Sequence, residues 1–175
     1  MEVIRDLEII FCGLGRATQY NGAGRRRYSL SFKTTDKATK KALESYHFNV
    51  QTKEDEETEK VFYQARIYAN AYAALEGTNG QQDDFDRPLD PPLVQLANGE
   101  PVDPDTVGAG SICHIAFKTY QTKKMDNPGR EIKRISVKKW VKRTPTDDNP
   151  FEEEEVEIVE EAPDVESTGG EGDLY

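Results

Sequence analysis

The sequence contains few of the residues that catalysis, zinc binding or disulfide bonding require. Its 175 residues include two cysteines, Cys12 and Cys113, and two histidines, His47 and His114. The cysteines lie in separate apolar stretches without the spacing of a zinc site or a disulfide framework, so we expect buried thiols. The histidines have no serine elbow or cysteine partner near them in sequence, which favours structural roles. We predict a protein that is not an enzyme and that uses no metal or cofactor.

Long apolar runs are also absent. No stretch approaches the roughly 20 apolar residues that span a bilayer, so we expect no membrane contact. The first residues lack the form of a signal peptide, because Glu2 and Asp6 flank only a short apolar stretch. We therefore expect a soluble protein of the cytoplasm.

Positive charge is missing from residues 146–175, which hold thirteen acids and no lysine or arginine. The whole chain has 33 acids, 23 lysines and arginines, and a net charge of −10; without those thirteen acids, residues 1–145 keep 20 acids and a net charge of +3. The self-repulsion and sparse apolar content of the acidic segment leave it little to bury. We predict one folded domain over residues 1–145 and a disordered acidic tail over residues 146–175.

Residues 1–145 show the period of half-buried β-strands. Apolar and polar residues alternate in several segments, which predicts an all-β fold. These segments are 3–13, 28–33, 61–70, 110–122 and 131–143. In the first segment Leu7, Ile9 and Phe11 share one parity, and we predict that this face is buried.

The connections between these segments have different characters. Residues 36–48 show helical spacing with Asp36 as the N-cap, which predicts one short helix. Residues 52–60 are polar and of mixed charge, as in a loop. The proline-rich stretch 79–106 predicts a long loop with one extended piece at residues 93–96.

Aromatic and basic side chains combine on the strand faces opposite the predicted core. Phe62, Arg66 and Tyr68 alternate along one strand, which makes a poor core lining and a good stacking platform. The alternative, in which both rings pack beneath a loop, is equally compatible with the pattern. Trp140, the chain's one tryptophan, lies among basic residues, although a bulge would turn it into the core.

A proline-rich loop and the strand entry that follows it complete the pattern. They are carried by Pro91, Pro92, Asn98, Gly99, Pro101, Val102, Asp103 and residues 108–111. Together with the β-rich body, its basic aromatic face and the acidic tail, they make the chain resemble the single-stranded DNA-binding proteins of bacteriophages. The resemblance covers most of the chain. It implies an OB-fold, a five-stranded Greek-key barrel with long loops and one or two short helices.

The resemblance also implies sequence-independent binding of single-stranded DNA in phage DNA replication, recombination and repair, in the cytoplasm of the host cell. Bases would stack on aromatic rings, and basic side chains would neutralise phosphates. The DNA-binding residues expected on this basis are Arg25, Arg26, Arg27, Phe62, Arg66, Tyr68, Lys118, Tyr120, Lys123, Lys124, Arg134, Lys138, Trp140 and Lys142.

The acidic tail has two hypothetical roles. Folded back, its carboxylates would compete with DNA for the basic face. Displaced by DNA, its last residues Asp173, Leu174 and Tyr175 would recruit replication proteins, such as a polymerase, primase, helicase or nuclease. A tail that only increases solubility is the alternative.

Two other functions stay open at this point. The same electrostatics permits an RNA-binding or duplex-binding module. An acidic adaptor or DNA-mimic protein would instead use the tail to bind a basic protein partner. The sequence is compatible with either a monomer or a homodimer.

Overall fold

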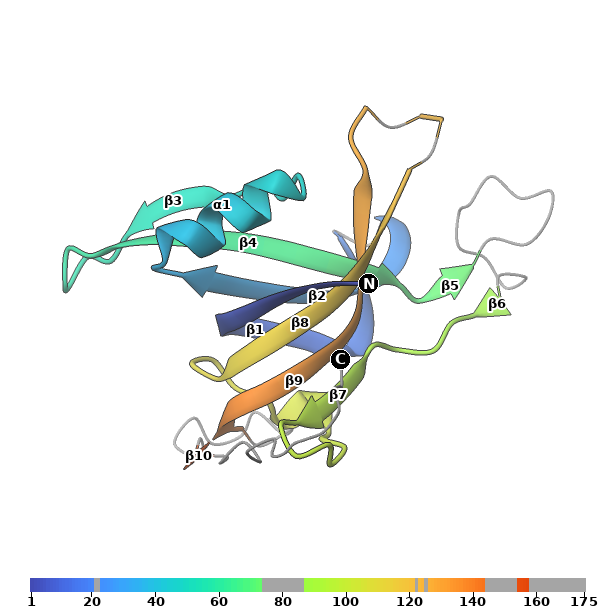
Figure 1. Ribbon diagram of the computed structural model, residues 1–175. Helices are drawn as coiled ribbons and strands as arrows, with labels where there is room; N and C mark the ends of the chain where they lie inside the picture. Colours follow the sequence, from blue (N-terminus) through green and yellow to red (C-terminus); the bar gives the residue numbers. More distant parts are fainter. Residues whose placement is uncertain (21–22, 74–86, 122, 125, 144–153, 158–175) are drawn as a thin grey trace.

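A computed structural model of the chain describes residues 1–20, 23–73, 87–121, 123–124, 126–143 and 154–157. The fold is built on one sheet of eight strands, and five long strands of that sheet form a barrel (Figure 1). These are β1 (Glu2–Tyr20), β2 (Ala23–Thr34), β4 (Val61–Asn70), β8 (Ile112–Tyr120) and β9 (Gly129–Lys142).

The order of these five strands defines the fold. β1, β2 and β4 form an antiparallel meander, and β8 and β9 form an antiparallel hairpin. β8 lies antiparallel beside β1, and β9 closes the ring by a parallel pairing between Tyr68 of β4 and Glu131. A five-stranded Greek-key barrel with this closure is an OB-fold. The predicted fold class is confirmed.

Shorter elements decorate the barrel. β3 (Gln51–Glu54) extends the sheet beyond β4, β7 (Leu93–Leu96) pairs parallel with β9, and β10 (Glu154–Glu157) pairs antiparallel with the end of β9. β5 (Tyr72–Ala73) and β6 (Arg87–Pro88) form a separate two-stranded ribbon. A short 3₁₀ helix, η1 (Pro104–Thr106), precedes β8. The predicted extended piece at residues 93–96 is therefore confirmed as β7.

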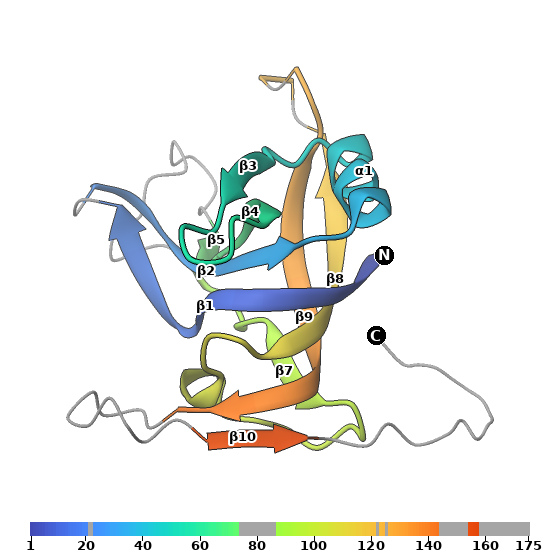
Figure 2. The ribbon, with the colours of Figure 1, turned by 90° about the vertical axis from the view of Figure 1, so that its left-hand side faces the viewer.

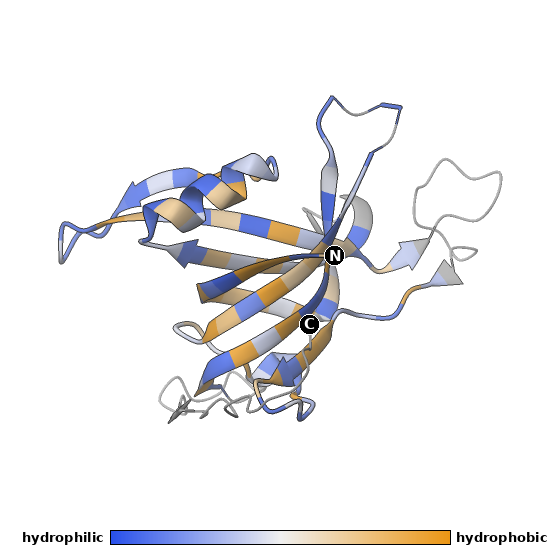
Figure 3. Cartoon of the chain, in the orientation of Figure 1, coloured by the Kyte–Doolittle hydropathy of each residue, from blue (hydrophilic) through white to orange (hydrophobic). Residues whose placement is uncertain are grey.

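The core fills the barrel with the inward side chains of the alternating strands. Figure 3 shows apolar and polar residues alternating along these strands. The largest side chains that are completely enclosed come from all five strands and the helix; they include Leu7, Leu30, Phe32, Leu43, Ile67, Phe117 and Ile135. Cys12 and Cys113 are buried free thiols, as the sequence predicted.

Helix α1 (Lys37–Ser45) packs against β1 and β2. Asp36 caps it, because its carboxylate accepts a hydrogen bond from the Thr39 amide at 3.2 Å, which confirms the predicted helix start. The turn after the helix buries Phe48, whose ring meets the rings of Phe32 and Phe117 edge to face at 5.9 and 5.4 Å. Helix and turn thus complete the core on this side of the barrel.

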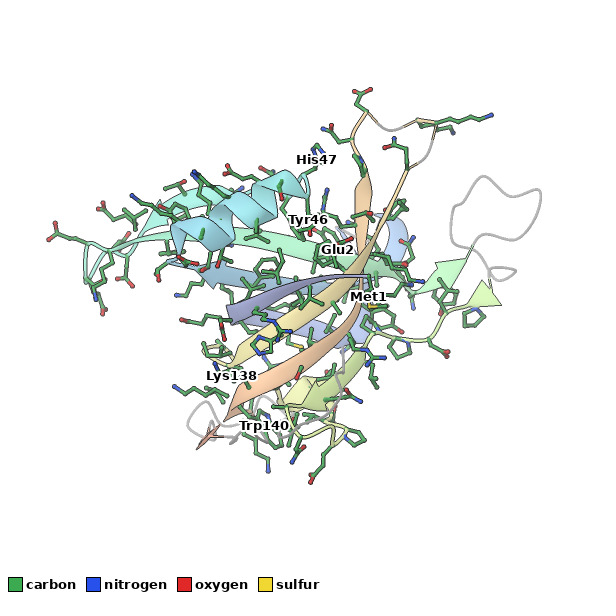
Figure 4. All side chains as sticks on the ribbon, in the orientation of Figure 1. Met1, Glu2, Tyr46, His47, Lys138 and Trp140 are labelled. Carbon is green, nitrogen blue, oxygen red and sulfur yellow. The ribbon has the colours of Figure 1, made fainter. Side chains whose placement is uncertain are left out.

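Tyr46, the last residue of the helical turn, fixes the start of β1. Its hydroxyl donates a hydrogen bond to the carboxylate of Glu2 at 2.9 Å, and Figure 4 shows the two side chains side by side. Its ring also packs edge to face on Phe117, with centroids 5.3 Å apart.

Three predicted features differ in the structure. Residues 52–60 were expected to be a loop, but Gln51–Glu54 forms β3, because its backbone pairs with β4 from Gln64 to Val61. Phe11 was expected to be buried and is 49% exposed. Within the acidic segment, where no regular structure was expected, Glu154–Glu157 forms β10, while residues 144–153 and 158–175 lie outside the described residues.

Candidate nucleic-acid interface

The outer surface of β1, β2, β4 and β3 forms one face, which we call the β2–β4 face. Side chains of alternate residues stand on this face because a strand has a period of two. The register of the pairings brings together Glu8, Phe11, Gly13, Arg27, Ser29, Ser31, Lys33, Gln51, Lys53, Phe62, Gln64, Arg66, Tyr68 and Asn70. The face carries four basic residues and a single acid, Glu8, so it attracts anions.

A β-bulge places Phe11 on the β2–β4 face. Ile9 pairs with Phe32, but Phe11 pairs with the next residue, Ser31, so one extra residue of β1 shifts the alternation. The Phe11 ring lies over Gly13, where a Cβ atom would come within 2.8 Å of the ring. Phe11 is therefore an exposed aromatic residue of the face that the sequence did not identify. The glycine at position 13, which leaves room for the ring, was the available signal.

The other two aromatic residues of the face each hold a cation. The Arg27 guanidinium lies 3.8 Å from the centroid of the Tyr68 ring, and the Lys33 ammonium lies 4.8 Å from that of Phe62. Such contacts hold positive charge against the aromatic rings of the face. Lys33 is also paired with Glu8 at 3.5 Å.

Arg66 stands between these two aromatic residues. Its Nε donates a hydrogen bond to the Ser31 hydroxyl at 3.0 Å, and its Nη1 donates to the Tyr68 hydroxyl at 3.4 Å. The side chain is exposed and has no carboxylate partner among the described residues. Arg66 thus presents a fixed positive charge that no described carboxylate neutralises. Such a charge suits the phosphate contact that the sequence predicts for this residue.

A groove of about 290 Å³ opens at the edge of β4, and we call it the β4 groove. It is lined by Asn49, Gln51, Gln64, Ala65, Arg66, Ile67, Tyr68 and Arg130. The groove is continuous with the β2–β4 face through Gln64, Arg66 and Tyr68. Four of its polar residues, Asn49, Gln51, Gln64 and Arg130, were not among those that the sequence indicated as binding residues.

Arg130 at the start of β9 is held firmly at this groove. Its Nη1 donates hydrogen bonds to the carbonyl oxygens of Pro128 at 3.1 Å and Tyr46 at 3.3 Å, and its guanidinium lies 4.9 Å from the ring centroid of Phe48. Burial lowers the pKa of the guanidinium, which nevertheless stays charged at neutral pH. Its Nε is buried and has no hydrogen-bond partner among the described residues.

The β8–β9 hairpin projects beyond the barrel and carries further predicted residues (Figure 1). Lys118 and Tyr120 are exposed near its base, and Lys123 and Lys124 are exposed at its tip. The Tyr120 ring crosses Gly129, where a Cβ atom would meet the ring within 3 Å. These residues form a basic rim beside the start of β9.

The structure separates the remaining predicted residues of β9 from the β2–β4 face. Arg134 pairs with Ala116 of β8, on the outer surface of the hairpin strands. Lys138 contacts the Asp6 carboxylate at 3.1 Å, and Figure 4 shows it near the opposite end of β9 from the hairpin turn. The predicted residues thus occupy two surfaces rather than one.

Trp140 is turned toward the core. It is half-buried and packs against the hydrophobic cluster, and its indole N–H donates a hydrogen bond to the Thr106 carbonyl at 3.1 Å. Lys142 lies 5.0 Å from the centroid of its ring. The alternative in which a bulge turns Trp140 into the core therefore describes its packing better than a position on an open basic face.

Some predicted residues have no described side chain. Arg26 is exposed and Arg27 lies on the β2–β4 face, whereas the side chain of Arg25 is outside the described residues. Asp173, Leu174 and Tyr175 are also outside them. Their predicted roles stay predictions.

The described residues hold neither a metal-binding cluster nor a membrane-spanning helix. No group of three or more histidine, cysteine or acidic side chains within them is arranged to hold a metal ion. None of their helices has the length and apolar character needed to cross a membrane.

Comparison with known proteins gives similarity at the level of structure. Neither a protein-family model nor a curated protein matches the sequence. The chain is similar to gp2.5, a single-stranded DNA-binding protein encoded by bacteriophage T7, at 13% identity and a TM-score of 0.41, over 87% of this chain and 96% of gp2.5. It is also similar to the single-stranded DNA-binding protein from bacteriophage Enc34 in complex with single-stranded DNA, at 15% identity and a TM-score of 0.45, over 85% of this chain and 88% of that one. The OB-fold assignment rests on the strand order and pairing described above.

Proposed function

We propose that the chain binds single-stranded DNA without strong sequence preference, through the β2–β4 face. The observation that carries this proposal is the array of Phe11, Tyr68 and Phe62 with Arg27, Lys33 and Arg66 on one outer face of an OB-fold barrel. The corresponding face of OB-folds binds oligonucleotides, between the loops that join strands one to two and four to five. Here those loops belong to the β1–β2 and β8–β9 hairpins.

The chemistry of the face fits a single strand better than a duplex. Unpaired bases expose their π-faces, which stack on aromatic side chains at about 1–3 kcal/mol per base. Lysine and arginine neutralise the phosphates between stacked bases and release counterions, so affinity falls as salt rises. Because every base has a π-face, such binding tolerates any sequence.

We further propose that residues 1–145 form the binding domain and that residues 146–175 act as an acidic regulator. Its carboxylates would compete with DNA for the basic face, and Asp173, Leu174 and Tyr175 would recruit replication proteins once DNA displaces the tail. Replication, recombination and repair of phage DNA are the processes in which such a protein would act.

Fluorescence anisotropy of labelled oligo-dT, titrated with the full chain at several salt concentrations, tests the proposal. We expect Arg66→Ala to weaken binding and to reduce the slope of log affinity against log salt by about 0.7, the value for one phosphate of a single strand. Lys41→Ala, which removes an exposed charge of α1, is the matched control and should leave the slope unchanged.

Two outcomes would contradict the proposal. Equal affinity for duplex DNA or RNA in competition would favour the alternative nucleic-acid modules. Absence of oligo-dT binding, both in the full chain and after deletion of residues 146–175, would favour an acidic adaptor or DNA mimic.

A further inference from the structure

The β4 groove has polar groups that the fold leaves without partners. β3 pairs with β4 only as far as Gln64, and β9 pairs with it only from Tyr68. Between these two residues the outer edge of β4 has no pairing strand among the described residues. The unpaired segment is about 10 Å long at roughly 3.3 Å per residue.

The main chain of this segment forms part of the groove. The side chains of Ala65 and Ile67 point inward and are only 4% and 1% exposed, although both residues line the groove. Their backbone N–H and C=O groups point toward β2, because pairs of this parity are the hydrogen-bonded ones, as the bond from the Ala71 amide to the Arg26 carbonyl shows. The N–H and C=O of Arg66 face the open edge instead, where no described strand pairs with them, and such groups seek hydrogen-bond partners. A stretch this short is too small for a useful strand addition, but it suits a compact planar ligand.

Carboxamides surround the open edge. Asn49, Gln51 and Gln64 line the groove, and Gln51 stands directly opposite Gln64 in the sheet. No side-chain hydrogen bond joins any of these three amides to another described residue. Each amide offers both a donor and an acceptor.

Two guanidinium groups complete the groove, from Arg66 and Arg130. Arg130 is fixed by Pro128 and Tyr46 and keeps a buried Nε without a partner among the described residues. Arginine pairs well with the O6 and N7 acceptors of guanine, and asparagine or glutamine pairs well with base edges that offer a donor beside an acceptor.

We propose that the β4 groove binds the edge of one purine base, with guanine preferred, in a DNA strand that stacks on the β2–β4 face. This inference rests on the proposed function and adds a single base-reading position to otherwise sequence-tolerant binding. A phosphate needs donors only, and the backbone carbonyl oxygen of Arg66 and the oxygens of the amides repel it. A guanine edge uses both the arginine donors and these acceptors.

The test measures the affinity of the full chain for oligo-dT hosts that carry one central guest nucleotide, dG, dA, dC or dT. We expect the dG guest to bind at least about fivefold more tightly than the all-dT host, the lower end for one bidentate base contact. The double variant Gln51→Ala/Gln64→Ala should reduce this ratio to near one. Gln95→Ala on β7, a glutamine away from the groove, is the matched control and should keep the ratio.

The possible results separate the two proposals. A wild-type ratio of one, with oligo-dT still bound, overturns the groove assignment and leaves the proposed function standing. A preference for the dG guest that survives in the double variant also overturns it. So does inorganic phosphate that competes with the DNA for the wild type but not for the double variant, because the groove would then bind phosphate. Failure of every oligonucleotide to bind overturns the proposed function itself. Thermal unfolding of each variant verifies that the fold is retained.

Discussion

Replacement of Phe11 by alanine is the most direct perturbation of the β2–β4 face. Phe11 is 49% exposed and its ring lies close to Gly13, so about half of the side chain is open to a base. It carries no charge and lies outside the hydrophobic cluster of the barrel. Its removal should therefore affect DNA binding far more than folding.

The expected magnitude follows from one lost stack. A base–aromatic stack contributes about 1–3 kcal/mol, and with only about half of the side chain exposed we expect about 1–2 kcal/mol, or a five- to thirtyfold rise in Kd for oligo-dT. The free energy of unfolding should change by no more than about 1 kcal/mol, because the residue is half exposed. Anisotropy titration and thermal unfolding measure the two quantities.

The salt dependence of this variant distinguishes stacking from charge. Phe11→Ala removes no cation, so its binding curve should shift equally at every salt concentration, whereas Arg66→Ala should also reduce the slope. Leu93→Ala, which truncates a residue of β7 that is 41% exposed, serves as the control for loss of exposed apolar area. An unchanged Kd for Phe11→Ala, or an equal loss for Leu93→Ala, would refute the stacking role of Phe11.

Three further predictions concern the scaffold. Asp36→Ala should lower the melting temperature of α1 and the barrel. Hydrogen bonds from Thr39 lower the pKa of Asp36 below its usual 3.8. The stability that the Asp36 carboxylate contributes is therefore present above that value and is lost as pH falls through the lower folded pKa, which a melting series against pH will show. Gly129→Ala should turn the exposed Tyr120 ring away from β9, because the added Cβ would meet the end of that ring within 3 Å, and shifted ring resonances of Tyr120 in NMR spectra would reveal it. Burial raises the pKa of Cys12 to about 11, so this thiol should resist a thiol reagent at neutral pH until denaturant is added; rapid labelling of the native protein would contradict its burial.

The sequence predicted the strands whose alternation is regular. In β4 the expected outer residues Phe62, Arg66 and Tyr68 do share one face, because neither bulge nor break interrupts its pairing with β2. The helix was also predictable, since its start depends on a local cap. The elements predicted correctly are those whose signal, a regular alternation or a cap, lies within a few neighbouring residues.

Features that depend on pairing between distant segments were not predictable. The parity of Phe11 was wrong because a bulge between Ile9 and Phe11 is visible only in the pairing of β1 with β2. Gln51 belongs to a segment that looked like a loop, and its position opposite Gln64 follows from the pairing of β3 with β4. The β4 groove could not be predicted for the same reason, because it exists only where the pairing of β4 passes from β3 to β9.

The position of β10 determines which part of the acidic segment can compete with DNA. β10 pairs with Lys139–Lys142 at one end of β9, and Figure 2 shows it at the opposite end of the barrel from the β8–β9 hairpin. Arg130, the second residue of β9, lines the β4 groove at the other end of the strand. Nine residue steps along β9 lead from Arg130 to Lys139, a span of up to about 30 Å, which exceeds the Debye length of about 8 Å at physiological salt. The strand β10 itself therefore lies too far from the groove to compete strongly with DNA there. Residues 144–153 join β9 to β10 and are held at both ends at this side of the sheet. We therefore propose residues 158–175 as the competitor, because 18 residues can extend as far as about 60 Å from β10. Deleting residues 158–175 alone should then tighten oligo-dT binding as much as deleting residues 146–175, and a clearly smaller effect would assign the competition to the segment nearer the barrel.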